Sequence, residues 1–246
     1  MNTVRLTAAC SRMTKNNALK VESSSFAGVL TGDITGSQSY SNDDFGNILA
    51  ALQQHLSKYA KRYSGNFDIY RGDAFQLVIG QPKYAMHIAL GLRLALKAHT
   101  PSVDVRISVA VGEAHFRPSE VKTGTGEAFV LSGRGLDMIK PHYLAFYSSD
   151  VKLENKTQLL TRFADAHVSG LTQTQSQTLL AYLEASDKSH ENVAAALDKN
   201  RSNVSRILNA SNYKLVAEYL SYMEQELVLM QQESGLLNTK QVDKEE

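Results

Sequence analysis

Residues 26–36, FAGVLTGDITG, and residues 67–79, FDIYRGDAFQLVI, decide the fold of this chain. The first stretch is a short apolar run that stops in glycine, aspartate and threonine, a pattern that predicts a buried strand followed by a tight loop. The second has two strand-like runs on either side of Arg71-Gly72-Asp73, which is the chemistry of a hairpin turn. Asp33 is therefore expected just after the first strand, and Asp73 at the tip of the hairpin.

Helical and strand-like patterns alternate around these two stretches. The order strand–helix–hairpin–helix–strand–helix–strand predicts an α/β (α+β) sandwich, with helices covering a mostly antiparallel sheet. Strict alternation of apolar and polar residues makes the strand at residues 103–112 the clearest one. The remaining expected elements are helices at residues 42–59, 82–99 and 128–138, strands at 103–112 and 143–147, and a loop rich in Gly and Thr at 118–126.

The chain divides into four predicted parts, with the main boundary in the weakly polar stretch 148–156. Its 246 residues carry a net charge of +1, which hides a basic body and an acidic end: residues 1–150 sum to +4, residues 151–214 to +2 and residues 215–246 to −5. The near-neutral total therefore does not count against a nucleic-acid partner. The predicted parts are a loose arm at residues 1–25, the α/β domain at 26–150, a helical module at 151–234 and a disordered tail at 235–246.

Several classes of protein are excluded by composition. No uncharged apolar run approaches the ~18 residues of a membrane span, and the N-terminal residues lack the continuous apolar core of a secretory signal. Cys10 is the only cysteine, which excludes an internal disulfide framework and favours a reducing cytoplasm. The seven histidines show no zinc-binding spacing. Both Met1 and Met13 remain open as the start of the protein.

Asp33 and Asp73 form the first candidate site. If their strands are neighbours, both carboxylates emerge at one end of the sheet, where they suit Mg²⁺ holding a nucleoside triphosphate. Gly32, Gly36 and Ser37 are candidates for turning backbone N–H groups toward the phosphates. The alternative is that both aspartates serve only as turn residues.

Four sequence blocks, in this order, resemble the SatD-like family, which is related to the class III nucleotidyl cyclases: VLTGDITGSQ, YRGDAFQLVI, VRISVAVGEAHF and GTGEAFVLSGRGLD. The resemblance covers roughly residues 26–147. It implies a cyclase-type α/β fold in which Asp33 and the Ile34 carbonyl face one metal ion and Asp73 joins as second ligand. It also implies that Arg134, on a helix, stabilises phosphate, which makes Arg134 the candidate catalytic residue.

Two departures from the cyclase pattern weaken the case for catalysis. Val130 stands where cyclases usually carry an asparagine, and Ile69 stands where a base-reading lysine often precedes the hairpin. We therefore expect a nucleotide-binding relic or sensor rather than an efficient cyclase. The alternatives are an active Mg²⁺-dependent nucleotidyl cyclase or nucleotidyltransferase, and a scaffold that binds no ligand. Arg71 has two open interpretations, a phosphate contact or a solvated hairpin charge.

Residues 190–211, HENVAAALDKNRSNVSRILNAS, form the second candidate site. Two short helices around a four-residue turn, with a small alanine where they touch, are typical of a helix-turn-helix. In the DNA-binding interpretation, residues 202–208 enter the major groove, and residues 198–214 carry a local charge of +3. The alternative is a helical hairpin for protein contacts. The candidate DNA-binding residues are Lys199, Arg201, Ser202, Asn203 and Arg206.

A heptad-like row of apolar residues follows the second candidate site. Its spacings of 4, 3, 4 and 3 residues are those of a coiled-coil seam. A seam that forms a homodimer and a seam that packs on the helix-turn-helix both remain open. The row contains Val216, Leu220, Met223, Leu227 and Met230. The sequence as a whole predicts a cytoplasmic DNA-binding regulator whose cyclase-like domain binds a nucleotide or mediates dimerisation.

Overall fold

The computed structural model describes residues 25–70, 72–117 and 120–242. Three predictions therefore lie outside the described residues: the loose arm up to residue 24, the role of Arg71, and the last four residues of the tail. None of the helices in the described part of the chain is long and apolar enough to cross a membrane.

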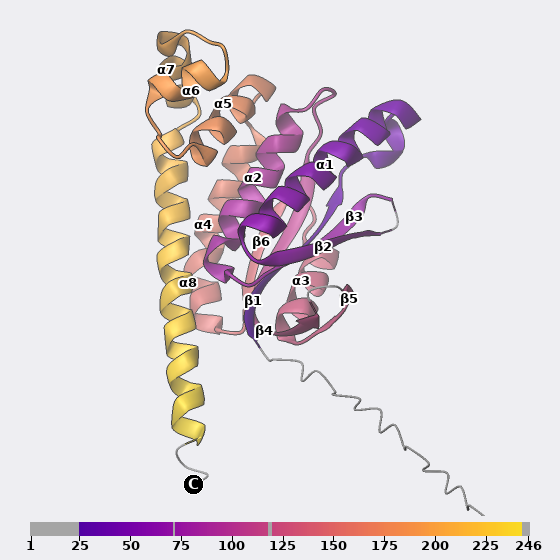
Figure 1. The fold of residues 1–246 in the computed structure, drawn as a ribbon, viewed down its shortest axis with the longest axis vertical. Helices are drawn as coiled ribbons and strands as arrows, with labels where there is room; N and C mark the ends of the chain where they lie inside the picture. Colours follow the sequence, from indigo (N-terminus) through magenta and orange to yellow (C-terminus); the bar gives the residue numbers. More distant parts are fainter. Residues whose placement is uncertain (1–24, 71, 118–119, 243–246) are drawn as a thin grey trace, which may run out of the picture.

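One six-stranded sheet forms the centre of the molecule (Figure 1). Its strands run in the order β2-β3-β1-β4-β5, and β6 pairs with β4. The β4–β6 pair is parallel and all the other pairs are antiparallel, which confirms the predicted mostly antiparallel sheet. The strands are β1 Ser25–Ile34, β2 Gly65–Tyr70, β3 Ala74–Ile79, β4 Val105–Arg117, β5 Glu120–Thr125 and β6 Leu144–Ser148.

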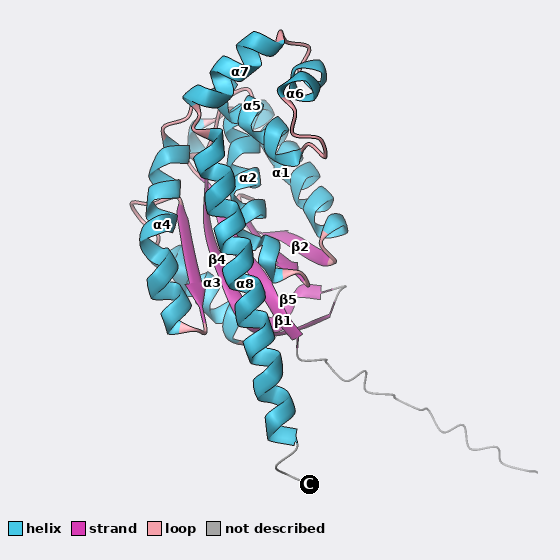
Figure 2. Ribbon diagram, turned by 90° about the vertical axis from the view of Figure 1, so that its left-hand side faces the viewer, coloured by secondary structure: helices cyan, strands magenta, loops and turns pink. Residues whose placement is uncertain are grey.

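Helices cover both faces of this sheet, and a helical bundle continues beyond it (Figure 2). The helices are α1 Asn42–Arg62, α2 Ala85–Ala98, α3 Glu127–Met138, α4 Val151–Ser169, α5 Gln173–Glu184, α6 His190–Ala196, α7 Arg201–Ala210 and α8 Tyr213–Val242, with short 3-10 turns η1 Ser37–Ser39 and η2 Pro82–Tyr84. Helices α1 and α2 pack on one face of the sheet, and α3 packs on the other together with β5.

The central strand β1 is longer than the sequence pattern indicates. It continues through Gly32 and Asp33 to Ile34, so the expected tight loop begins only afterwards. The reason is pairing on both sides: Gly32 and Asp33 pair with β3 as well as with β4, and the two ladders satisfy the backbone of these positions. Gly32 serves packing here, because a Cβ at this position would lie 2.6 Å from the Phe75 ring.

Two other predictions of irregular structure are wrong. Strand β5 occupies most of the expected loop at residues 118–126, because its polar residues pair with the end of β4. Helix α8 continues to Val242, through most of the segment predicted to be a disordered tail.

The helical region from α4 onward shares a hydrophobic core with the sheet. Leu153 on α4 and Leu179 on α5 belong to the same buried cluster as Leu30 of β1 and Leu90 of α2. The whole heptad-like row of α8, from Val216 to Met230, belongs to this cluster as well. The row therefore packs inside its own chain, which corrects its interpretation as a dimer seam.

A buried ionic cluster ties the helices to the start of β4. Arg93 on α2 is fully buried and donates to both carboxylate oxygens of Asp104, at 3.0 and 2.6 Å, and to Asp165 on α4, at 2.8 Å. The Asp104 carbonyl in turn accepts from the backbone N–H and the hydroxyl of Thr35, at 3.0 and 2.8 Å. The cluster thus fixes the loop that follows β1, next to the first candidate site.

Candidate functional site

The Asp33 carboxylate is engaged by an arginine that the sequence analysis does not single out. Arg106 on β4 lies directly opposite Asp33 in the antiparallel register, so both side chains leave the same face of the sheet. The guanidinium contacts the carboxylate side-on: Nε donates to Oδ1 at 2.9 Å, and Nη2 donates to Oδ2. Both side chains are about one-fifth exposed, at 21% for Arg106 and 24% for Asp33. The result is a bidentate ion pair in a partly shielded position.

Asp73 lies beside Asp33, as predicted, because the hairpin β2–β3 pairs with β1. Its carbonyl accepts from the backbone N–H of Ile34 at 3.0 Å, and its carboxylate Oδ2 accepts from the Ser37 hydroxyl at 2.8 Å. The structure thus brings together Asp33, Ile34, Ser37 and Asp73 at one end of the sheet. The Ile34 side chain itself is buried in the core.

A cavity of about 540 Å³ opens at this position. Residues of β1, β3 and β4 line it, together with residues of α3 and Lys140, which follows that helix. Its volume falls within the several hundred Å³ typical of small-molecule sites. The polar and charged side chains that line it include Asp33, Tyr70, Asp73, Arg106, Asp137 and Lys140.

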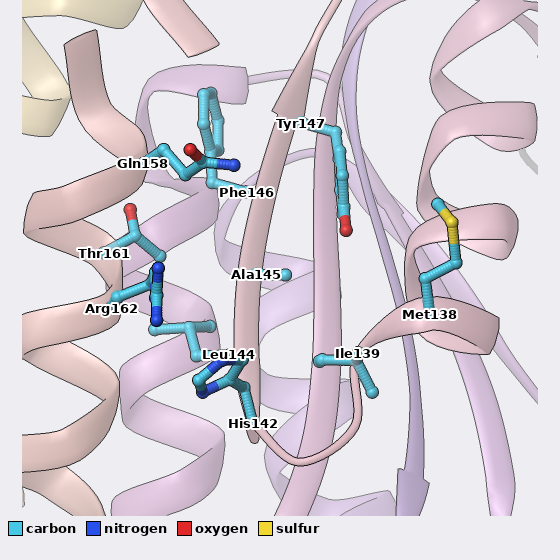
Figure 3. Close-up of a pocket in the computed structure, with 10 residues that line it drawn as sticks. All are labelled: Met138, Ile139, His142, Leu144, Ala145, Phe146, Tyr147, Gln158, Thr161 and Arg162. Atoms are coloured by element: carbon cyan, nitrogen blue, oxygen red, sulfur yellow. The ribbon is translucent and has the colours of Figure 1, made fainter. Parts of the chain in front are cut away.

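A second pocket lies against the edge strand β6 and is much smaller, at about 100 Å³ (Figure 3). Gln158, Thr161 and Arg162 reach toward it from α4, whereas Met138 lies on the other side of the strand. A nucleotide does not fit this volume. The cavity at Asp33 and Asp73 is therefore the better candidate for a ligand of that size.

The donor set of the cavity does not fit a divalent metal ion. Both oxygens of Asp33 are paired with Arg106, and one oxygen of Asp73 is taken by Ser37. Within residues 25–70, 72–117 and 120–242, no group of three or more His, Cys, Asp or Glu side chains could hold a metal ion. The guanidinium of Arg106 therefore lies where the Mg²⁺ ion predicted on Asp33, Ile34 and Asp73 would bind.

The other predicted nucleotide-binding residues are placed differently from one another. Gly36 adopts a left-handed conformation, with φ of 67°, and starts η1, so a glycine is needed for the turn. Arg134 lies on an exposed part of α3, and it is not among the residues that line the cavity. Ser132 itself anchors α3, because its hydroxyl contacts that of Thr31 at 2.9 Å.

Helices α6 and α7 occupy the second candidate site, at the end of the molecule opposite the C-terminus (Figure 1). They are separated by residues 197–200, and Asp198 in this turn has a φ of 50°. An aspartate is accommodated in this left-handed conformation because Asp tolerates it better than most residues do. Their shared contact is a small cluster of Val193, Ala194, Val204 and Leu208.

The candidate DNA-binding residues lie on the solvent-facing side of α7 and its turn. Arg201, Asn203 and Arg206 are exposed, and Arg206 donates to the Asn203 amide oxygen at 3.0 Å. The Ser202 hydroxyl donates to Asn200, the N-cap of α7, at 2.7 Å. Lys199 is only half-exposed and contacts Gln177 at 3.0 Å.

Comparisons with known proteins give structural likenesses only: no protein-family model matches the chain, and no curated protein matches it. One similar solved structure is the monomeric guanylyl cyclase domain of the RhoGC fusion protein from the aquatic fungus Blastocladiella emersonii, with 22% identity, a TM-score of 0.41, and coverage of 50% of this chain and 81% of that chain. The guanylate cyclase domain of RhGC from Catenaria anguillulae in complex with GTP has 21% identity, a TM-score of 0.40, and coverage of 50% and 78%. The adenylyl cyclase CyaB from P. aeruginosa has 17% identity, a TM-score of 0.39, and coverage of 47% and 73%. The chain is thus similar, over about half its length, to nucleotidyl cyclase domains, and no residue role follows from this likeness.

Proposed function

We propose that this chain is a DNA-binding regulatory protein whose sheet domain binds a nucleotide. The observation that carries the proposal is the cavity of about 540 Å³ in which Arg106 and Lys140 lie beside the two aspartates. Guanidinium and ammonium groups are the side chains that bind phosphate in proteins. Tyr70 adds an aromatic side chain that suits stacking against a base.

A thermal-shift experiment tests the nucleotide part. The four ribonucleoside triphosphates, and their di- and monophosphates, are added to the full chain with EDTA or with Mg²⁺. A ligand that binds only the native state stabilises it by about 2.7 kcal/mol at 100 times its Kd, which gives a clear rise in Tm. Lys140→Glu should abolish the rise, and the matched surface change Lys152→Glu on α4 should not. No rise with any nucleotide in either buffer would refute this part.

The DNA-binding part of the proposal rests on a separate feature, the division of α7 into two faces. Val204 and Leu208 on one face are buried, while Arg201, Asn203 and Arg206 on the other are exposed. Arginine and asparagine side chains on such a face are suited to reading guanine and adenine edges in the major groove. We also propose that the chain belongs to the SatD-like family and that it forms a homodimer that pairs two α7 helices.

Fluorescence anisotropy with pooled genomic fragments tests DNA binding. Arg206→Ala should weaken binding and should lower the slope of log K against log salt by about 0.9 if this arginine contacts a phosphate. If it contacts a base instead, affinity should fall for the preferred fragments while the slope changes little. Lys152→Ala is the control. Equal binding by the wild type and by an Arg201→Ala/Arg206→Ala double variant would refute the proposed interface.

An active nucleotidyl cyclase or nucleotidyltransferase is the competing function. Incubation of the chain with each triphosphate and Mg²⁺ or Mn²⁺, followed by mass spectrometry of the products, distinguishes the two. We expect the triphosphate to be recovered unchanged. A cyclic product that disappears in Asp73→Ala would replace the binding function with catalysis.

A further inference from the structure

We infer that Arg106 occupies the position of a divalent cation beside Asp33, so that the cavity takes a phosphate-bearing ligand without a metal ion. The first half of this inference stands on the geometry of Asp33, Asp73 and Arg106. The second half, the metal-free ligand, rests on the proposed nucleotide-binding function.

The position of Arg106 is built into the sheet. Asp33 and Arg106 are direct partners in the β1–β4 ladder, one pair before the end of a continuous pairing that runs from Ser25 to Ile34 of β1. Side chains at directly opposed positions of an antiparallel pair lie side by side on one face. The register therefore keeps the guanidinium within reach of the carboxylate whenever this part of the sheet is formed.

The pairing leaves little for a cation to bind. Arg106 contacts both oxygens of Asp33, and the Ser37 hydroxyl contacts Oδ2 of Asp73. Magnesium binds through carboxylates whose oxygens are open to it, and it requires near-ideal octahedral geometry. Here a cation would have to approach within a few ångströms of a guanidinium that carries a permanent positive charge.

The same arrangement favours an anion. The two hydrogen bonds to Asp33 use two of the five N–H donors that a guanidinium carries. Lys140 contributes a second positive charge to the lining of the same cavity. A phosphate group bound by Arg106 and Lys140 would receive the charge neutralisation that a metal ion supplies elsewhere. The ligand class is therefore a phosphate ester or anhydride bound in its metal-free form.

Mn²⁺ binding to the full-length chain, measured by electron paramagnetic resonance of the free ion, tests the first half. The wild type should bind no stoichiometric Mn²⁺ at this site. Arg106→Gln removes the charge and keeps a long polar side chain. It should bind Mn²⁺ at least about tenfold more tightly, as expected when a unit charge about 4 Å from a dication is removed. Asp33→Asn added to Arg106→Gln should reverse the gain.

Stoichiometric Mn²⁺ binding by the wild type that is lost in Asp73→Asn would overturn the inference. Failure of both Arg106→Gln and Arg106→Ala to gain Mn²⁺ binding would overturn it as well, with circular dichroism confirming that each variant is folded.

A second measurement separates this inference from the proposed function. The wild type should bind a fluorescent triphosphate analogue in EDTA, and Mg²⁺ should raise the apparent Kd or leave it unchanged, because Mg²⁺ complexes the free triphosphate. Binding that requires Mg²⁺ would overturn the metal-free half of the inference. Absence of binding in both buffers would instead refute the proposed function, and the Mn²⁺ results on Arg106 would still decide whether the arginine excludes the cation.

Discussion

Replacement of the buried Arg93 by methionine should destabilise the whole chain strongly. The arginine is fully buried, and its loss would leave Asp104 and Asp165, whose side chains are 13% and 5% exposed, without their principal cationic partner. Removing one member of a buried ion pair costs about 3–5 kcal/mol, because the remaining charge is desolvated and uncompensated. Methionine retains much of the volume, so this cost reflects charge more than a cavity.

Urea denaturation followed by circular dichroism and by tyrosine fluorescence measures this effect. Arg162→Met on the exposed side of α4 is the control, and it should change the free energy of unfolding by no more than about 0.5 kcal/mol. Since α2 and α4 share one core, both probes should report a single transition at a lower urea concentration in Arg93→Met. A loss below about 1 kcal/mol, or two separate transitions of which only one moves, would refute the reasoning.

Three further changes test the fold. Burial lowers the pKa of His55 and of His87 below 6.5, so the unfolded chain takes up protons that the folded chain does not. The free energy of unfolding should therefore fall as the pH drops below about 6.5, by up to about 1.4 kcal/mol per pH unit for each histidine. The double variant His55→Gln/His87→Gln should flatten this slope in urea titrations at a series of pH values. An unchanged slope would contradict the assignment. Gly32→Ala should lower the free energy of unfolding by about 1–3 kcal/mol, because its Cβ would lie 2.6 Å from a carbon of the Phe75 ring. Gly46→Ala on α1, whose Cβ would have nothing within 4 Å, should instead raise the Tm. Equal effects would contradict the packing. Asp198→Val should lower the free energy of unfolding by about 1–2 kcal/mol, because Asp198 has a left-handed backbone conformation, and Asp198→Gly should not lower it. Thermal denaturation measures both variants, and a valine variant as stable as the wild type would argue against this turn.

Much of the sheet domain could be predicted because its signals are local. Alternation in β4, the hairpin around Gly72 and the apolar face of α1 each lie within one short window of sequence. Strand β5 was missed because its sequence, EVKTGT, alternates β-branched residues with Glu, Lys and Gly, which are depleted in strands, and pairing with β4 supplies what propensity does not.

The partner of Asp33 could not be predicted for a different reason. Arg106 belongs to a strand in which apolar and polar residues alternate, and this pattern alone indicates a polar residue that faces solvent. Only the register between β1 and β4, which joins positions far apart in the sequence, places it on Asp33. The packing partner of the heptad-like row of α8 could not be predicted for the same reason, because periodicity identifies an apolar face and does not identify what covers that face.

Photoaffinity labelling tests the central claim, that a nucleotide binds in the cavity of the sheet domain, most directly. The full chain is irradiated with 8-azido-ATP or 8-azido-GTP in EDTA, and the labelled peptides are mapped by mass spectrometry. We expect a label on peptides that contain Tyr70 or Lys140, which excess unlabelled nucleotide should reduce and Lys140→Glu should abolish. A label that excess nucleotide does not reduce, or a competed label confined to peptides outside the cavity, would contradict it.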